Sequence, residues 1–217
     1  MNPVIAVLLA AGIFNAQVRD RPEDPVAVAR RFMPPRSELA TLYTFDDKTQ
    51  QFGPDTPAAL NCHVLGSDSE DIVFAYYSPQ SHVLEKSLFV DLLHSSGEGY
   101  EKVFELSYRA QVLFVPEAIR LLRLPGMQTD AVAVMAAEGA ALGGHLDMFV
   151  WRDPWGWQNV FPPNGAVEYF YFRPAPDGML VALSSAHHPG RDNMPPPQPP
   201  PTWFRWNGKE FAKAQPP

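Results

Sequence analysis

The sequence predicts an all-β protein built from degenerate four-stranded β-meander repeats, with a short helix near the N-terminus. Three observations predict this class. Apolar segments in the middle of the chain recur at intervals of about 60 residues. Turn residues, above all Gly and Asp, separate short apolar runs. Proline occurs 24 times in 217 residues, and this density limits helices and strands to short lengths.

The first 16 residues have the pattern of an export signal. Residues 4–14 are apolar over a length too short to cross a membrane, and a polar segment follows from Gln17. We therefore expect a signal peptide at residues 1–16, and a mature protein that is periplasmic or secreted and has no membrane span. Because no Lys or Arg precedes the apolar run, a native N-terminal helix is the alternative interpretation.

Residues 17–57 precede the repeats and contain a predicted helix, strand and loop. Asp24 is a typical helix N-cap, and Pro25 suits the first helical position. The apolar and aromatic residues 39–45 predict a strand. Residues 46–57 are polar and rich in Gly and Pro, which predicts a loop.

The repeats occupy residues 58–214 and divide into units at residues 58–111, 112–165 and 166–214. Each unit has the order strand, turn, apolar strand, hairpin, amphipathic strand, and a glycine-aromatic turn before the last strand. One such unit leaves an apolar face that a neighbouring unit has to cover. We therefore expect a partial propeller-like array or a β-sandwich.

Two pairs of residues align the first two units. Asp71 and Asp130 each precede an apolar strand, and Tyr100 and Trp157 each follow a glycine. A repeat conserves the place of each element, so we expect Tyr100 and Trp157 to occupy equivalent buried sites.

The first strand of the second unit has two interpretations. Residues 116–124 contain good helix formers between Pro116 and Pro125, a pattern typical of a helix. The aligned residues 58–65 favour a strand, and the alignment places Cys62 on Leu121. We follow the repeat and expect a strand, in which Cys62 is a small buried residue rather than a catalytic thiol.

The order of strand, turn, Asp, apolar strand and later glycine-aromatic pair resembles the FG-GAP or VCBS repeats of integrin-type β-propellers. The resemblance covers residues 58–214 and implies propeller-like packing of the sheets. In that family the turn holds calcium on an acidic loop, whose last acidic position corresponds to Asp71 and Asp130. The other loop positions hold no carboxylate: His63, Leu65, Ser67, Leu122, Leu124 and Gly126. Calcium needs about six to eight oxygen ligands, so we expect no metal and no cofactor.

The candidate binding residues are Trp151 and Trp155, which flank Pro154 in a predicted hairpin turn. Aromatic side chains on a rigid turn bind sugar faces or peptides. For the tryptophans as a group we favour packing between the units, because large aromatic side chains are usually buried. Within the group, Trp157 is assigned to the core and Trp155 is expected to be the most exposed.

The leading functional prediction is a non-catalytic extracytoplasmic module that binds an unidentified protein or glycan, or serves a structural role. The net charge of −7 argues against nucleic acid as a partner. The sequence has no zinc-protease motif, nucleophile elbow or phosphate-binding glycine loop. Two alternatives stay open: carbohydrate binding through Trp151 and Trp155, and an exported hydrolase-like enzyme using His187 or His188. Residues 194–201, rich in proline, are interpreted as a stiff connector.

We expect the protein isolated from its native cell to begin after Ala16, because the apolar run and the polar segment behind it have the pattern of a cleaved signal. Mass spectrometry of the N-terminal peptide measures this directly. The same chain made by cell-free synthesis is the unprocessed reference. A mature protein that retains Met1 or Asn2 contradicts the prediction.

Overall fold

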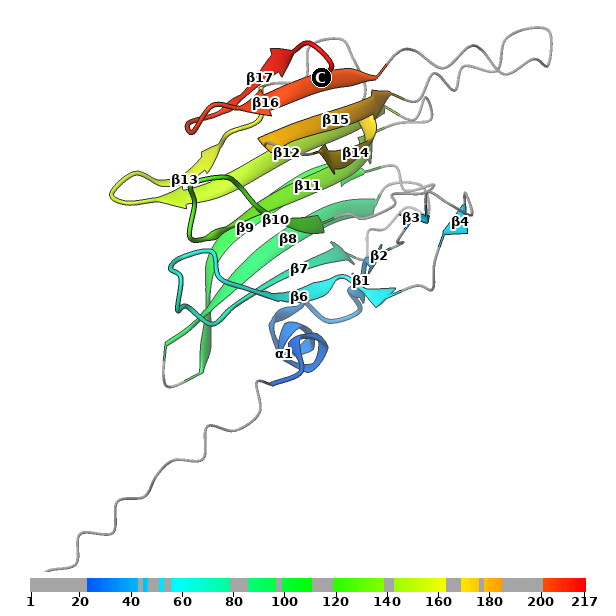
Figure 1. The fold of residues 1–217 in the computed structure, drawn as a ribbon. Helices are drawn as coiled ribbons and strands as arrows, with labels where there is room; N and C mark the ends of the chain where they lie inside the picture. The colour runs from blue at the N-terminus through cyan, green and yellow to red at the C-terminus, as the bar shows by residue number, and fades with distance from the viewer. Residues whose placement is uncertain are drawn as a thin grey trace, which may run out of the picture.

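The computed structural model describes residues 23–42, 45–46, 51–52, 56–78, 86–96, 99–110, 119–138, 143–162, 169–175, 178–184 and 201–217. These residues form antiparallel strands and one short helix, which confirms the predicted all-β class. The strands form an open stack of sheets and do not close into a propeller ring (Figure 1).

Helix α1 (Pro25–Phe32) begins at Pro25, as predicted. The Asp24 carboxylate accepts a hydrogen bond from the backbone N–H of Val26 at 3.1 Å and caps the first turn. Val28 and Ala29 are fully buried and belong to a cluster with residues of the first sheet. Burial of one apolar face against the sheet therefore stabilises a helix that is too short to be stable alone.

Five two-residue strands follow the helix: β1 (Glu38–Leu39), β2 (Thr41–Leu42), β3 (Phe45–Asp46), β4 (Gln51–Phe52) and β5 (Thr56–Pro57). They divide the predicted strand at residues 39–45 and place short paired strands in the predicted loop. Ala40 donates a backbone hydrogen bond to Ala75 and accepts one from Ala58, both at 2.8 Å. These long-range partners, which no local pattern encodes, decide where the short strands form.

Three antiparallel meanders of four strands each form the body of the protein, one within each predicted unit. The first contains β6 (Ala59–Cys62), β7 (Asp71–Ser78), β8 (Lys86–Ser95) and β9 (Tyr100–Ala110); the second contains β10 (Ile119–Arg123), β11 (Asp130–Glu138), β12 (Gly143–Arg152) and β13 (Gly156–Asn159); the third contains β14 (Tyr169–Ala175), β15 (Met179–Ser184), β16 (Thr202–Trp206) and β17 (Phe211–Ala214). β1 extends the first sheet beside β7. Strand β10 confirms the strand interpretation of a segment whose local pattern favours a helix.

The sheets stack face to face in chain order, and α1 covers the outer face of the first sheet (Figure 1). In the middle sheet, residues 131–135 of β11 are all buried. Val132 and Val134 face Val73 and Val90 of the first sheet. Because side chains alternate along a strand, Ala131, Ala133 and Met135 point to the opposite face, towards the third sheet. The middle sheet is therefore apolar on both faces.

Aromatic side chains fill the interface between the second and third sheets. The ring of Phe161, just after β13, lies 4.7 Å from that of Phe204 and 6.0 Å from that of Phe211, measured between centroids. The indole N–H of Trp206 donates to the backbone oxygen of Pro125 at 3.1 Å. This hydrogen bond satisfies the polar end of a nearly buried indole and links the two sheets.

The structure corrects the alignment of the first two units. Cys62 faces Asp71 across β6 and β7, whereas Arg123 faces Asp130 across β10 and β11. The turn after β6 is longer than the turn after β10, which shifts the preceding strand. Cys62 is therefore equivalent to Arg123 and not to Leu121, although it is buried as predicted.

The predicted equivalence of Tyr100 and Trp157 is wrong. Tyr100 faces Ser95 at the end of β8, but the residue that faces Arg152 at the end of β12 is Gly156. The turn after β12 is the shorter one, and a shift of one residue turns a side chain to the other face of the sheet. Tyr100 accordingly packs on the side of α1, whereas Trp157 packs in the main core.

Trp157 stacks on Phe104 of the first sheet at 4.3 Å and meets Trp151 edge-on at 5.7 Å, both between ring centroids. We expect Trp157→Ala to lower the free energy of unfolding by about 3 kcal/mol, because it leaves a cavity between two sheets. Trp155→Ala, on the same hairpin but exposed, is the matched control and is expected to stay within about 1 kcal/mol of wild type. Denaturant unfolding followed by circular dichroism measures both. Equal losses in the two variants contradict this assignment.

Candidate functional site

The hairpin between β12 and β13 is the candidate binding element. The two strands pair as far as Arg152 and Gly156, so residues 153–155 form the turn. Gly156 has a φ of 75°, a left-handed conformation that glycine adopts without strain. The local sequence thus ends the strand pair in a tight turn whose tip is Trp155.

Trp151 supports this turn from below. Its indole N–H donates to Asp153 Oδ1 at 3.1 Å. A Cβ atom on Gly156 would lie 3.5 Å from the Trp151 ring, so the ring fits closely against the backbone of the turn. The ring is partly buried and packs against the main core, with Trp157 as its edge-on neighbour. Trp151 therefore shapes the turn and offers little free surface.

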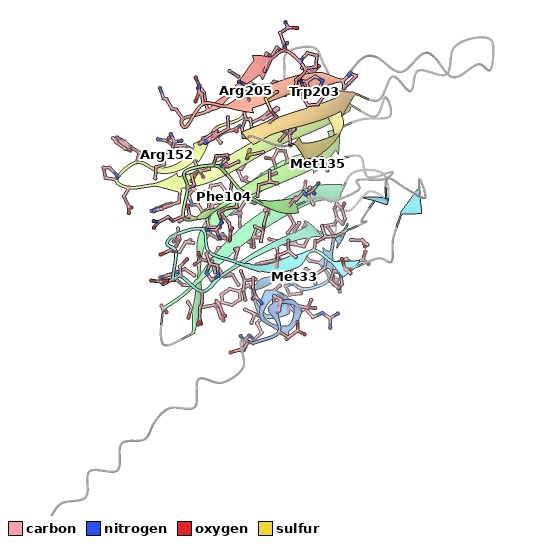
Figure 2. The ribbon with its side chains drawn as sticks, viewed as in Figure 1. Met33, Phe104, Met135, Arg152, Trp203 and Arg205 are labelled. Carbon is pink, nitrogen blue, oxygen red and sulfur yellow. The ribbon has the colours of Figure 1, made fainter. Side chains whose placement is uncertain are left out.

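Arg152 fastens the base of the hairpin to the third sheet. Its guanidinium donates to the backbone oxygen of Lys209 at 2.7 Å, and its Cζ lies 5.8 Å from the centre of the Trp206 ring. It also donates to Gln158 Oε1 at 3.3 Å. Figure 2 shows Arg152 and Phe104 along the same edge of the stack. The hairpin is thus held by contacts from two sheets.

Trp155 stands at the tip of this hairpin with 73% of its surface exposed. Among the described residues, Trp155 is the one large hydrophobic side chain that is exposed. The exposure predicted for Trp155 is confirmed, whereas Trp151 belongs largely to the core. Sequence reasoning missed the anchoring role of Arg152, whose one local signal is its place next to the predicted turn.

A second polar cluster surrounds Asp71, whose carboxylate is buried at the start of β7. Its Oδ2 accepts hydrogen bonds from the backbone N–H groups of Val64 at 2.8 Å and Leu65 at 2.9 Å, and from the Ser69 hydroxyl at 2.6 Å. Its Oδ1 lies 2.8 Å from Nδ1 of His94, which donates to it. The turn after β6 therefore folds around a carboxylate that protein donors satisfy.

Asp130 has a different set of partners from Asp71. Its Oδ2 accepts from the backbone N–H of His63 at 2.8 Å, and its own N–H donates to the His63 carbonyl at 2.8 Å. Its Oδ1 forms an ion pair with Arg123 at 2.9 Å. The two aspartates thus have different roles. Asp71 shapes the turn after β6, and Asp130 holds that turn against the second sheet.

His94 is the nearest approach to a catalytic group in the described residues. A buried carboxylate orients its ring, and 31% of its side chain is exposed, as for a general base in a hydrolase. Among those residues no nucleophile is hydrogen-bonded to its other nitrogen. The Cys62 thiol is buried, and burial together with the charges of Asp71 and Asp130 raises its pKa, so the thiolate is disfavoured.

Several residues singled out in the sequence lie outside the described residues. They are His187, His188 and the prolines before Pro201. The hydrolase alternative based on His187 or His188 therefore stays a prediction.

Comparison with known proteins gives no family for this chain, since no protein-family model and no curated protein matches it significantly. In the part of the chain that the structure describes, no group of three or more His, Cys, Asp or Glu side chains is placed to hold a metal ion. Nor does that part contain a helix long and apolar enough to cross a membrane.

Asp91 is a buried charge in the first sheet. Its side chain is fully buried on β8, and neither oxygen accepts a hydrogen bond from the described residues. Lys102 Nζ lies 3.4 Å from Oδ2 and also pairs with the exposed Glu105. Burial raises the pKa of Asp91 to about 6, and the charge of Lys102 offsets part of that effect. Asp91 is therefore an internal titrating group that no substrate reaches.

We expect Asp91 to make stability fall as the pH rises. Its pKa is higher in the folded chain than in the unfolded chain, so its favourable contribution is complete below about pH 4 and is lost as the pH passes 6. Asp91→Asn lacks this titration. The stability of the variant relative to wild type should therefore increase between pH 4 and 7, by at most about 3 kcal/mol.

Denaturant unfolding at a series of pH values measures this difference. Glu105→Gln, which removes the exposed partner of Lys102, is the control and should show a much smaller change over the same range. A constant difference between Asp91→Asn and wild type from pH 4 to 7 contradicts the assignment.

Proposed function

We propose that this protein is a non-catalytic, extracytoplasmic binding module that holds a glycan against Trp155. The observation that carries the proposal is the 73% exposure of Trp155 at the tip of a hairpin that Trp151 and Arg152 anchor. An indole loses little side-chain entropy on binding, and an anchored turn loses little backbone entropy.

The surroundings of Trp155 favour a glycan over a protein partner. A protein interface has a core of several apolar side chains inside a polar rim. Trp155 instead stands without a second exposed large hydrophobic side chain in the described residues. One indole matches the apolar face of one sugar ring. The exposed Asp153 beside it, and Lys209 on the adjoining turn, offer polar groups for sugar hydroxyls.

The binding interpretation also accounts for the polar groups better than catalysis does. The Asp71 carboxylate and His94 are used to fold the turn after β6, and Asp130 is used to join two sheets. The signal-like residues 1–16 support export, which brings the protein into contact with cell-surface and extracellular glycans.

Retention of the purified protein on insoluble polysaccharides, followed by calorimetric titration with soluble fragments of each polysaccharide that retains it, tests the proposal. We expect Trp155→Ala to weaken binding at least about tenfold, since it removes the stacking surface. Trp155→Phe keeps an aromatic ring and should bind with intermediate affinity. Glu101→Ala, exposed on the first sheet, is the control and should bind like wild type.

Two results contradict the proposal. One is a glycan affinity that Trp155→Ala leaves unchanged. The other is failure of every polysaccharide tested while Trp155 is required to capture a protein partner, which would make the hairpin a protein-binding element.

A further inference from the structure

A cleft of about 650 Å³ opens where the C-terminal end of α1 meets the short strands β1, β2 and β5. This volume lies within the range of roughly 300 to 1,000 Å³ that small-molecule sites occupy. Arg30, Met33, Arg36, Ser37 and Leu39 are among the residues that line it. Figure 2 shows Met33 at this junction of helix and sheet. The cleft is remote in the chain from the Trp155 hairpin.

The backbone holds Arg36 at the cleft against its local preference. Ser37 N–H donates to the carbonyl of Pro34 at 3.1 Å and closes a β-turn with Arg36 at the third position. Arg36 has a φ of 69°, the left-handed conformation for which such turns use glycine or asparagine. A larger side chain in this conformation costs stability, and such positions cluster at binding sites. The strained backbone therefore favours a binding role for the Arg36 side chain.

The charges of the cleft favour an anion. Arg30 and Arg36 both line it, and neither forms an ion pair within the described residues, whereas the neighbouring Arg31 pairs with Glu23 at 2.6 Å. Glu38 also lines the cleft, so among the described lining residues two guanidinium groups stand against one carboxylate. A guanidinium binds a carboxylate through two parallel hydrogen bonds.

Other features of the cleft select among anions. Ser37 Oγ is buried beside the cleft and has no hydrogen-bond partner in the described residues, so a ligand group that reached it would displace no protein partner. Met33, Leu39 and Pro57 provide apolar lining. The C-terminal end of a helix carries partial negative charge, which disfavours a doubly charged phosphate relative to a single carboxylate.

We propose that this cleft binds a small organic monocarboxylate, with its carboxylate at Arg30 and Arg36 and its apolar body against Met33 and Leu39. The carboxylate belongs either to a free acid or to the C-terminus of a peptide, since both present the same group. This site is separate from the proposed glycan site.

Calorimetric titration of the whole chain with benzoate tests whether the cleft binds a carboxylate with an apolar body. Benzamide has the apolar body without the charge, and inorganic phosphate has charge without the body. We expect benzoate to bind and both other probes to bind at least about tenfold more weakly. N-acetylphenylalanine identifies the source: tighter binding than benzoate indicates a peptide C-terminus, and weaker binding a free acid. No benzoate binding at millimolar concentration, or equal binding of benzamide, overturns the proposal.

Substitutions test whether Arg30 and Arg36 bind the carboxylate. Arg36→Gly relieves the left-handed backbone, so we expect it to unfold at the same or a higher temperature than wild type while binding benzoate at least about tenfold more weakly. Arg30→Gln should lose affinity similarly. Arg31→Gln is the matched control and should bind within about twofold of wild type. Trp155→Ala should keep full benzoate affinity, which separates this site from the glycan site. Unchanged affinity in both Arg30→Gln and Arg36→Gly overturns the proposal.

Discussion

The middle sheet has two apolar faces, and covering both of them is the constraint on which the rest of the structure depends. The first sheet covers one face through Val73 and Val90, and the third covers the other with Phe204 and Phe211. A single four-stranded unit cannot bury such a sheet, so the three units are stable as a stack. Helix α1 then covers the outer face of the first sheet, which would otherwise expose Phe74 and its neighbours.

Polar contacts between units determine how the stacked sheets are oriented. Asp71 folds the turn after β6 around its own carboxylate, and the backbone of His63 in that turn pairs with Asp130 of the second unit. Arg152 and Trp206 link the second unit to the third through backbone oxygens. Apolar burial drives the sheets together without direction, whereas these hydrogen bonds select one arrangement.

Both proposed binding sites lie where the stack meets solvent. At the hairpin, buried aromatic rings hold a turn that exposes one more ring, Trp155. At the cleft, a strained turn holds Arg36 near Met33, which follows α1, and near apolar residues of the short strands. In each case an ordered scaffold fixes the backbone that carries the exposed side chain before a ligand arrives, and this reduces the entropy lost when a ligand binds.

The sequence by itself determined the all-β class, the start of α1 and the exposure of Trp155, because strand periodicity, capping residues and turn residues act locally. For β10 the repeat predicted a strand against a local helical pattern, and the pairing with β11 in the tertiary structure decided between the two interpretations. Tertiary structure alone decided the register. A difference of one or two residues in turn length moved Cys62 opposite Asp71 and separated Tyr100 from Trp157. The contact of Asp71 with His94, the link between Asp130 and the backbone of His63, and the anchoring of Arg152 on the third sheet depend on pairings between distant segments, and such pairings leave no periodic signal in the chain.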